Sequence, residues 1–329
     1  MIVTRTPLRI SFAGGGTDMA AYYEQDDGVV LSTTITQYVY VTVKRHSNLF
    51  DEPIRVNYKV SEEVQSVDEI ENNIVRECLR LLDVGPPIYI SMVGDVPAST
   101  GLGGSSALTV GLLNALHAVK GERVSAGQLA EEACHIEIDV LSEPIGKQDQ
   151  YAAAFGGLNV FTFRSDGTVS VRPKNLALPV RNKLFESLIL FWTGNVRDAR
   201  AVLAEQRANV EIERGRLRKM SDQVVELETV LGTDLLDLAA FGRVLDEGWR
   251  LKRGLASGIS SGAIDDLYEG AIAAGALGGR LCGAGGGGFL LFVAPPDRRD
   301  AIRQALTGLT ELPVAHEVHG SHVVVPFDQ

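Results

Sequence analysis

The sequence predicts an α+β protein of two lobes, and three observations support this fold class. The 329 residues exceed the usual size of a single hydrophobic core. Much of the first third is rich in β-branched and aromatic residues, as strands are, whereas helical and strand-like segments alternate towards the C-terminus. We place the boundary in the turn-rich segment 165–179, which divides the chain into residues 1–175 and 176–329.

The first lobe is predicted to begin with sheet and to continue with helices. Strands are expected over 8–13, 29–43 and 88–93. Leucine and alanine residues spaced three or four apart predict a helix over 105–119, with Ser105 and Ser106 as capping residues. A second helix is expected over 126–141, because proline and glycine interrupt the pattern directly after it.

The second lobe is predicted to mix helices with strands. A strand is expected over 187–192, followed by a long charged helical region over 196–231 and a helix over 235–256. The tail is then expected to alternate, with helices over 264–274 and 297–306 and strands over 289–293, near 314 and near 323.

Composition narrows the range of partners. The formal net charge of −11 argues against nucleic acid and anionic membranes, which select for basic surface. No apolar run is long enough for a membrane span, and the N-terminus has no signal-peptide pattern. The three cysteines form no CxxC pair, which suits a reducing compartment. We therefore expect a cytoplasmic monomer or homodimer that acts on a small molecule.

A glycine-rich loop, DVPASTGLGGSSAL, connects a predicted strand to the helix at 105–119. Glycines at a helix N-terminus allow backbone N–H groups and the positive end of the helix dipole to face an anion. The loop contains no lysine, so it is not a Walker P-loop. Two interpretations stay open, a cradle for phosphate and a mobile turn capped by serine.

A second glycine run, GAGGGG at 283–288, formally matches the dinucleotide fingerprint. That fingerprint must open a helix, whereas the apolar segment FLLFVA follows here and predicts a strand. The run either brings backbone close to a ligand or provides a tight packing site between the lobes.

The segment EPIGKQDQ at 143–150 places a cation and a carboxylate two residues apart, Lys147 and Asp149. Adjacent positive charge would keep Asp149 ionised and able to accept a proton from a substrate hydroxyl. Glu137 on the preceding helix is close enough in the chain to face the same site, where Mg²⁺ would need oxygen ligands. A solvated surface pair is the alternative.

Four segments, in this order, resemble the motifs of the GHMP small-molecule kinases. They are PLRISFAGGGTD (7–18), PASTGLGGSSA (97–107), EPIGKQDQYAAAFGG (143–157) and LCGAGGGG (281–288). The resemblance implies a ribosomal-S5-like N-terminal lobe, a ferredoxin-like C-terminal lobe and phosphoryl transfer from ATP. The first segment is most similar to D-glycero-D-manno-heptose 7-phosphate 1-kinases, which implies that the anomeric hydroxyl of a sugar phosphate is phosphorylated for surface glycan synthesis. A kinase of free hexoses and a non-catalytic sugar sensor are the alternatives.

The resemblance also implies roles for individual residues. Asp149 would be the general base, Arg9 would stabilise the transferring phosphoryl group, and Ser105 and Glu137 would bind Mg²⁺. The ATP phosphates would lie on Pro97, Gly101, Leu102, Gly103, Gly104, Ser105 and Ser106, and the acceptor on Gly15, Gly16, Thr17, Asp18, Lys147, Gly285 and Gly286.

Two points stay open in this assignment. Gly104 stands where the family commonly has serine, so Ser106 is an alternative metal ligand to Ser105. A phosphorylated acceptor also needs a cation for its own phosphate. Lys147, Lys252, Arg253 and Arg280 are equal candidates for that contact.

Overall fold

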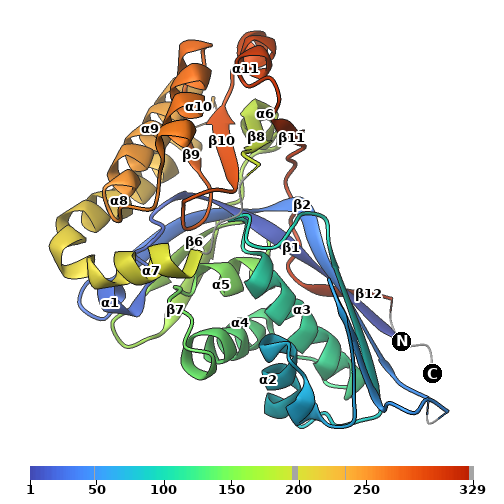
Figure 1. The fold of residues 1–329 in the computed structure, drawn as a ribbon. Helices are drawn as coiled ribbons and strands as arrows, with labels where there is room; N and C mark the ends of the chain where they lie inside the picture. The colour runs from blue at the N-terminus through green and yellow to red at the C-terminus, as the bar shows by residue number, and fades with distance from the viewer. Residues whose placement is uncertain (48, 195–198, 234, 326–329) are drawn as a thin grey trace.

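A computed structural model describes residues 1–325 apart from 48, 195–198 and 234. Each lobe contains one β-sheet, and helices cover the sheets (Figure 1). The N-terminal sheet has eight strands in the order β12-β1-β2-β5-β3-β4, with β6 on β2 and β7 on β6. The C-terminal sheet has four, in the order β11-β8-β10-β9.

The N-terminal lobe is built on a long antiparallel pair, β1 (Ile2–Ala13) and β2 (Gly28–Arg45). Helix α3 (Gly104–Val119) is apolar on almost every side, which suits a helix packed between the sheet and other helices. The remaining elements are α1 (Ala20–Tyr23), β3 (Ile54–Asn57), β4 (Ser61–Val64), η1 (Val67–Glu69), α2 (Asn73–Leu81), β5 (Ile88–Gly94), α4 (Ala126–Cys134), η2 (His135–Val140), α5 (Gln148–Phe155), β6 (Leu158–Phe163) and β7 (Val169–Pro173).

The C-terminal lobe has its sheet between helices and continues the core of the first lobe. Strand β10 (Phe289–Val293) is buried along its whole length, as a central strand covered on both faces must be. The other elements are α6 (Leu178–Ser187), β8 (Leu188–Trp192), α7 (Ala199–Ala208), α8 (Val210–Leu231), α9 (Leu238–Arg253), α10 (Gly262–Ala273), β9 (Gly278–Leu281), η3 (Pro296–Arg298), α11 (Arg299–Ala305) and β11 (Thr310–Leu312). The strand after them, β12 (His322–Val325), belongs to the N-terminal sheet.

The predicted strands and helices are present, although β11 ends at Leu312, before the strand expected near 314. The structure also contains elements that the sequence patterns do not predict, among them α2, β3, β4, α6 and β9. Three further details differ. Gly103, with φ of 78°, caps α3 in place of the expected Ser105 and Ser106, which lie within the helix. The helix expected over 126–141 becomes α4 followed by a π-helical turn, η2. The helical region expected from Val196 begins outside the described residues and divides at Asn209 into α7 and α8.

The C-terminal segment packs on the first lobe, although the predicted division assigns all residues after 175 to the second lobe. Strand β12 pairs with β1, and the segment before it contacts β2 through a bridge between Ile35 and His316. Ser321 donates its backbone N–H to Ala153 at the end of α5. The segment 316–325 therefore packs on the N-terminal lobe, and its strand β12 belongs to the N-terminal sheet.

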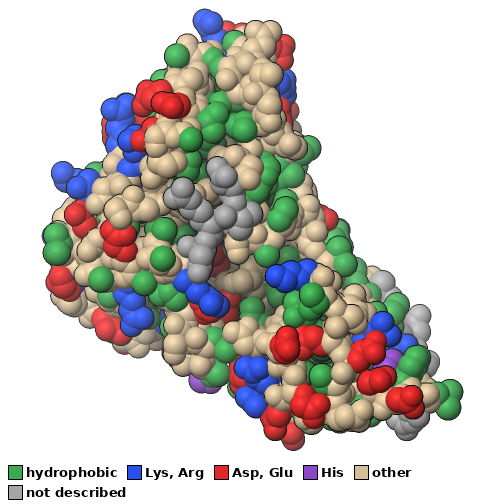
Figure 2. All heavy atoms as spheres, viewed as in Figure 1, with side chains coloured by type: hydrophobic (Ala, Val, Ile, Leu, Met, Phe, Trp, Pro, Cys, Tyr) green, Lys and Arg blue, Asp and Glu red, His purple; other side chains and the backbone are tan. Residues whose placement is uncertain are grey.

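Acidic and basic side chains are mixed across the face of the molecule seen in Figure 2. Within the described ranges, no helix combines the length and apolarity that crossing a bilayer requires.

Candidate active site

A cleft lies where the two lobes meet. Both lobes contribute to its walls: β1 and the loop after it, the N-terminus of α5, α7, α9, and the β9–β10 region. The lining residues are Arg9, Ser11, Gly15, Gly16, Asp18, Met19, Ile145, Gly146, Gln148, Asp149, Leu203, Gln206, Lys252, Arg280, Gly283 and Ala284.

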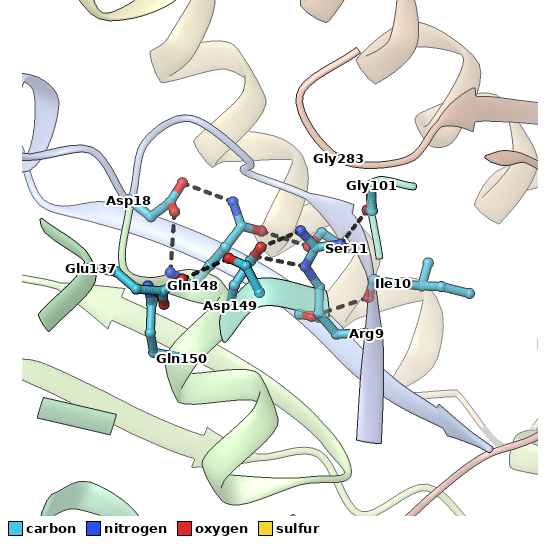
Figure 3. A network of polar contacts seen from close by, with 12 residues as sticks. Arg9, Ile10, Ser11, Asp18, Gly101, Glu137, Gln148, Asp149, Gln150 and Gly283 are labelled. Carbon is cyan, nitrogen blue, oxygen red and sulfur yellow. Dashed lines mark hydrogen bonds and ion pairs between the residues drawn. The ribbon is translucent and has the colours of Figure 1, made fainter. Parts of the chain in front are cut away.

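Arg9 and Asp149, which both line this cleft, form a bidentate ion pair (Figure 3). Nε and Nη2 of Arg9 donate to the two carboxylate oxygens of Asp149, each at 2.7 Å. Arg9 is 5% exposed, and burial, the largest single effect, lowers its pKa. The charge and hydrogen bonds of Asp149, with smaller contributions from Cys282 and Asp18, together outweigh burial and raise the pKa. Arg9 is therefore a fixed positive charge at this point of the cleft.

The fold brings the two residues together from distant parts of the chain. Arg9 faces inward from β1, where it pairs in register with Thr34 of β2. Asp149 lies in the first turn of α5, where the helix dipole favours a negative charge. The predicted partner of Asp149, Lys147, instead donates to the carbonyl of Gly167 at 3.0 Å. The cation beside Asp149 is thus Arg9, and the prediction of Lys147 is wrong.

The glycine-rich loop wraps around Arg9. Nη1 of Arg9 donates to the carbonyl of Gly101 at 2.6 Å, and its backbone N–H donates to the carbonyl of Leu102 at 3.0 Å. A Cβ on Gly103 would lie 3.2 Å from Cγ of Arg9 and 3.4 Å from the Asp149 carboxylate. The N-terminus of α3 therefore opens directly beside the ion pair, with its unpaired backbone N–H groups available for an anion.

The second glycine run, 283–288, packs against the glycine-rich loop. A Cβ on Gly283 would lie 2.3 Å from the Cα of Gly101, and one on Gly288 would lie 2.4 Å from the carbonyl oxygen of Thr100. These contacts favour the packing interpretation for this part of the motif. Gly283 and Ala284 also line the cleft, whereas Gly285 and Gly286 are not among its lining residues.

We predict that Gly101→Ala destabilises the protein. Gly101 has φ of 84°, and an added Cβ would lie 2.5 Å from the carbonyl oxygen of Cys282. The strained backbone costs about 1–3 kcal/mol before the contact is counted. Thermal unfolding should show a clear loss for Gly101→Ala and none for Gly104→Ala, whose added Cβ has no neighbour within 4 Å. Equal midpoints for the two variants would contradict this packing.

A buried carboxylate, Glu137, lies beside the start of α3. Its Oε1 accepts from Oγ of Ser105 at 2.6 Å, and its Oε2 accepts from Nε2 of Gln150 at 2.7 Å. Glu137 is 1% exposed, and burial raises its pKa to about 7, against the effect of its hydrogen bonds. It extends from η2, a π-helical turn of the kind often found at functional sites. The described residues provide no cation paired with it.

A second polar network holds the loop after β1. Oδ1 of Asp18 accepts from the N–H of Gly16 at 2.8 Å and from Nε2 of Gln148 at 3.0 Å (Figure 3). Oδ2 accepts from the N–H of Gln148 at 3.2 Å, and Oγ of Ser11 donates to Oε1 of Gln148 at 2.6 Å. Burial raises the pKa of Asp18. Gln148 thus connects β1, the glycine loop and α5, a role that the sequence analysis did not assign.

The structure gathers some of the expected site residues and separates others. Arg9, Gly15, Gly16, Asp18 and Asp149 share the cleft, and Ser105 meets Glu137. Thr17 is fully buried and bonds the carbonyls of Gly14 and Val29, so it supports the loop from behind. Pro97 is exposed at the beginning of the glycine-rich loop, and Ser106 is buried.

Comparison with known families agrees with this geometry. Residues 73–157 match the family described as GHMP kinases N terminal domain, and residues 232–309 match GHMP kinases C terminal. The chain is 30% identical to the D-glycero-alpha-D-manno-heptose 7-phosphate kinase of Campylobacter jejuni, and the match covers 93% of both proteins. The chain therefore belongs to the GHMP kinases. Members of this family use ATP as phosphate donor, so the protein is an ATP-dependent kinase.

Two further proteins show similarity over most of the chain. The crystal structure of a D-glycero-D-manno-heptose 1-phosphate kinase from Bacteroides thetaiotaomicron superposes with a TM-score of 0.80 at 25% identity, covering 100% of both chains. The L-fucokinase/L-fucose-1-P guanylyltransferase of Bacteroides fragilis is 25% identical over 92% of this chain but only 36% of its own length. The predicted two-lobed GHMP kinase fold is confirmed.

Proposed function

We propose that the protein transfers the γ-phosphoryl group of ATP to the anomeric hydroxyl of D-glycero-D-manno-heptose 7-phosphate. The observation that supports this proposal most directly is the Arg9–Asp149 ion pair, which lies beside the glycine-rich loop and the N-terminus of α3. The name of the Campylobacter jejuni relative and the resemblance of the first motif support the choice of sugar. The product would serve the synthesis of a nucleotide-activated heptose in the cytoplasm.

In this proposal the glycine-rich loop binds the ATP phosphates through backbone N–H groups. Arg9 provides the positive charge that a lysine provides in a Walker loop, since its guanidinium lies against Gly101. Asp149 accepts the proton of the attacking hydroxyl, and its contact with Arg9 fixes the direction of its oxygens. Phosphoryl transfer has a loose transition state, so positioning and positive charge contribute more than early removal of that proton.

The residues around Glu137 fit Mg²⁺. A buried carboxylate oxygen and a hydroxyl oxygen lie 2.6 Å apart, and oxygen ligands are those that Mg²⁺ prefers. Ser105 and Glu137 would hold the ion, which when bound would neutralise phosphate charge. Both Ser105 and Ser106 act on Glu137 through side-chain hydrogen bonds. Ser105 is exposed whereas Ser106 is 1% exposed, so we assign the hydroxyl ligand to Ser105. A cation at this position would favour the ionised form of Glu137.

Asp18 positions the acceptor in this proposal. Its Oδ1 already accepts two hydrogen bonds and its Oδ2 one, which leaves acceptor capacity on Oδ2 for a sugar hydroxyl.

We predict that Asp18→Asn raises KM for the sugar about tenfold while kcat changes less, because the amide cannot hold both N–H groups of Gln148. Steady-state kinetics with saturating ATP would check this. A fall in kcat with unchanged KM would assign Asp18 to the chemical step instead.

A panel of free sugars and sugar phosphates tests the proposed substrate. Turnover is scored by ADP release, and phosphorus NMR identifies the phosphorylated position. We expect a 1,7-bisphosphate from the heptose phosphate. Turnover of unphosphorylated hexoses alone would favour the fucokinase- or galactokinase-like alternative, and no turnover of any sugar would favour a sensor.

A further inference from the structure

Two buried cations of the second lobe, Lys252 and Arg280, line the cleft without a carboxylate partner. Lys252 lies at the end of α9 and is 4% exposed, and Arg280 lies in β9 and is 3% exposed. Among the ion pairs of the described chain, neither residue takes part. Buried charges are normally paired with opposite charges. Because Lys252 and Arg280 lack such a partner among the described residues, we infer that a bound ligand provides the negative charge.

Backbone carbonyls orient both side chains without neutralising them. Nζ of Lys252 donates to the carbonyl of Gly283, and Nη1 of Arg280 donates to the carbonyl of Phe12 at 2.8 Å. Nε of Arg280 is buried and has no hydrogen-bond partner in the described structure. Each cation of this cleft is thus oriented by one hydrogen bond to a backbone carbonyl, which leaves its charge without a counter-ion among the described residues.

The third cation of the cleft is in a different situation. Arg9 has its charge balanced by Asp149, so Lys252 and Arg280 supply the uncompensated positive charge. Burial lowers the pKa of Arg280 to about 10 and that of Lys252 well below its ordinary value. Repulsion from Arg9 adds to both effects, and repulsion from Arg280 adds to the effect on Lys252. An anion bound between them would reverse these effects and would be held correspondingly well.

Arg280 lies on the acceptor side of the cleft. A Cβ on Gly15 would lie 3.8 Å from Nη2 of Arg280 and 3.7 Å from Nε2 of Gln148. Gln148 in turn holds Asp18, which we assign to sugar hydroxyls. The guanidinium therefore faces the same space as the residues that would hold the sugar.

We propose that Lys252 and Arg280 bind the phosphate group of the acceptor sugar and so select a phosphorylated sugar over a free one. A guanidinium fork combined with an ammonium point charge suits a phosphate, which offers several anionic oxygens. The inference rests on the proposed function, and it gives that function its specificity. Lys147 and Arg253, the other candidates from the sequence, are not among the lining residues of the cleft. Lys147 donates to the carbonyl of Gly167, and Arg253 pairs with Asp265.

The test compares Lys252→Met and Arg280→Met with wild type on the heptose 7-phosphate and on the same heptose without phosphate. For each variant, kcat/KM for the phosphorylated sugar should fall at least about 30-fold, the low end of what losing one partner of a buried charge pair costs. For the free heptose it should change less than about threefold. Arg280→Lys should fall between wild type and Arg280→Met, because it keeps the charge but loses the fork.

Arg253→Met is the matched control, since Arg253 adjoins Lys252 in the chain and pairs with Asp265 at 2.7 Å outside the cleft. Thermal unfolding without ligand separates binding from folding. Removing an unpaired buried charge should leave the midpoint of Lys252→Met unchanged or higher, whereas a structural lysine would lower it.

Further outcomes distinguish this inference from the proposed function. If wild type prefers the phosphorylated sugar and both variants retain that preference, the inference is overturned and the proposed function stands. If the variants raise KM for ATP but keep the preference for the phosphorylated sugar, the two cations bind ATP, and the inference is likewise overturned. If wild type uses only free sugars, the proposed function fails. Calorimetric titration with inorganic phosphate then decides: binding that both variants abolish supports the phosphate site, and no binding overturns it.

Discussion

Asp149→Asn should lower kcat by about 10²–10⁴-fold, the usual contribution of a positioned general base. The amide cannot accept a proton at neutral pH, and it can no longer accept both N–H groups of Arg9. The glycine-rich loop does not depend on the carboxylate for its backbone geometry, since Arg9 still bonds Gly101 and Leu102. Binding of ATP, measured by calorimetry, should therefore stay close to that of wild type.

The matched control for this variant is Asp297→Asn, whose side chain is 76% exposed in η3 and remote from the cleft. It should leave both kcat and ATP binding unchanged. Near-normal turnover of Asp149→Asn would refute the assignment of the base. Loss of ATP binding together with turnover would instead show that the ion pair shapes the phosphate loop.

Glu137→Gln should reduce kcat/KM by about 10²-fold or more at ordinary Mg²⁺ concentration, because a neutral amide is a much weaker ligand for a hard cation. The substitution keeps the size of the side chain. Gln150 has an unpartnered Oε1 and can turn its amide to accept from the new group, so the fold should persist. Titration of activity against Mg²⁺ should show a curve displaced to higher concentration, with partial recovery at the top.

Glu62 offers a comparison for this second variant, because it is a buried carboxylate, 8% exposed, that accepts from the backbone of Glu71 and Asn72 far from the cleft. Glu62→Gln should affect stability alone and leave the Mg²⁺ titration in place. A Mg²⁺ curve for Glu137→Gln that coincides with that of wild type would remove Glu137 from the metal site.

Much of the fold could be predicted because local patterns and long-range packing agree. The apolar segment at 289–293 forms β10 with the expected bounds, and the helix at 105–119 differs from α3 by one residue. Its cap was mispredicted because the two serines satisfy a statistical preference, whereas the loop requires the positive φ that Gly103 provides. The return of β12 to β1 depends on tertiary pairing between the two ends of the chain, which no local pattern encodes.

The candidate site divides in the same way. The motifs point to Arg9 and Asp149 separately. Their direct contact could not be predicted from the sequence, because the two residues are 140 positions apart and only the fold brings them together. Lys147 was favoured for its nearness in sequence, but the first turn of α5 directs it towards Gly167. Lys252 and Arg280 could not be ranked above Arg253, because only burial separates an uncompensated charge in the cleft from one paired at the surface.

The pairing of β12 with β1 has a consequence for the synthesis of this protein. β1, with Arg9, leaves the ribosome long before β12, so the outer edge of β1 stays uncovered until β12 has been synthesised. An uncovered strand edge readily pairs with other chains. A premature stop shortly before residue 316 would therefore yield a product that holds Arg9, Glu137 and Asp149 but is prone to aggregate.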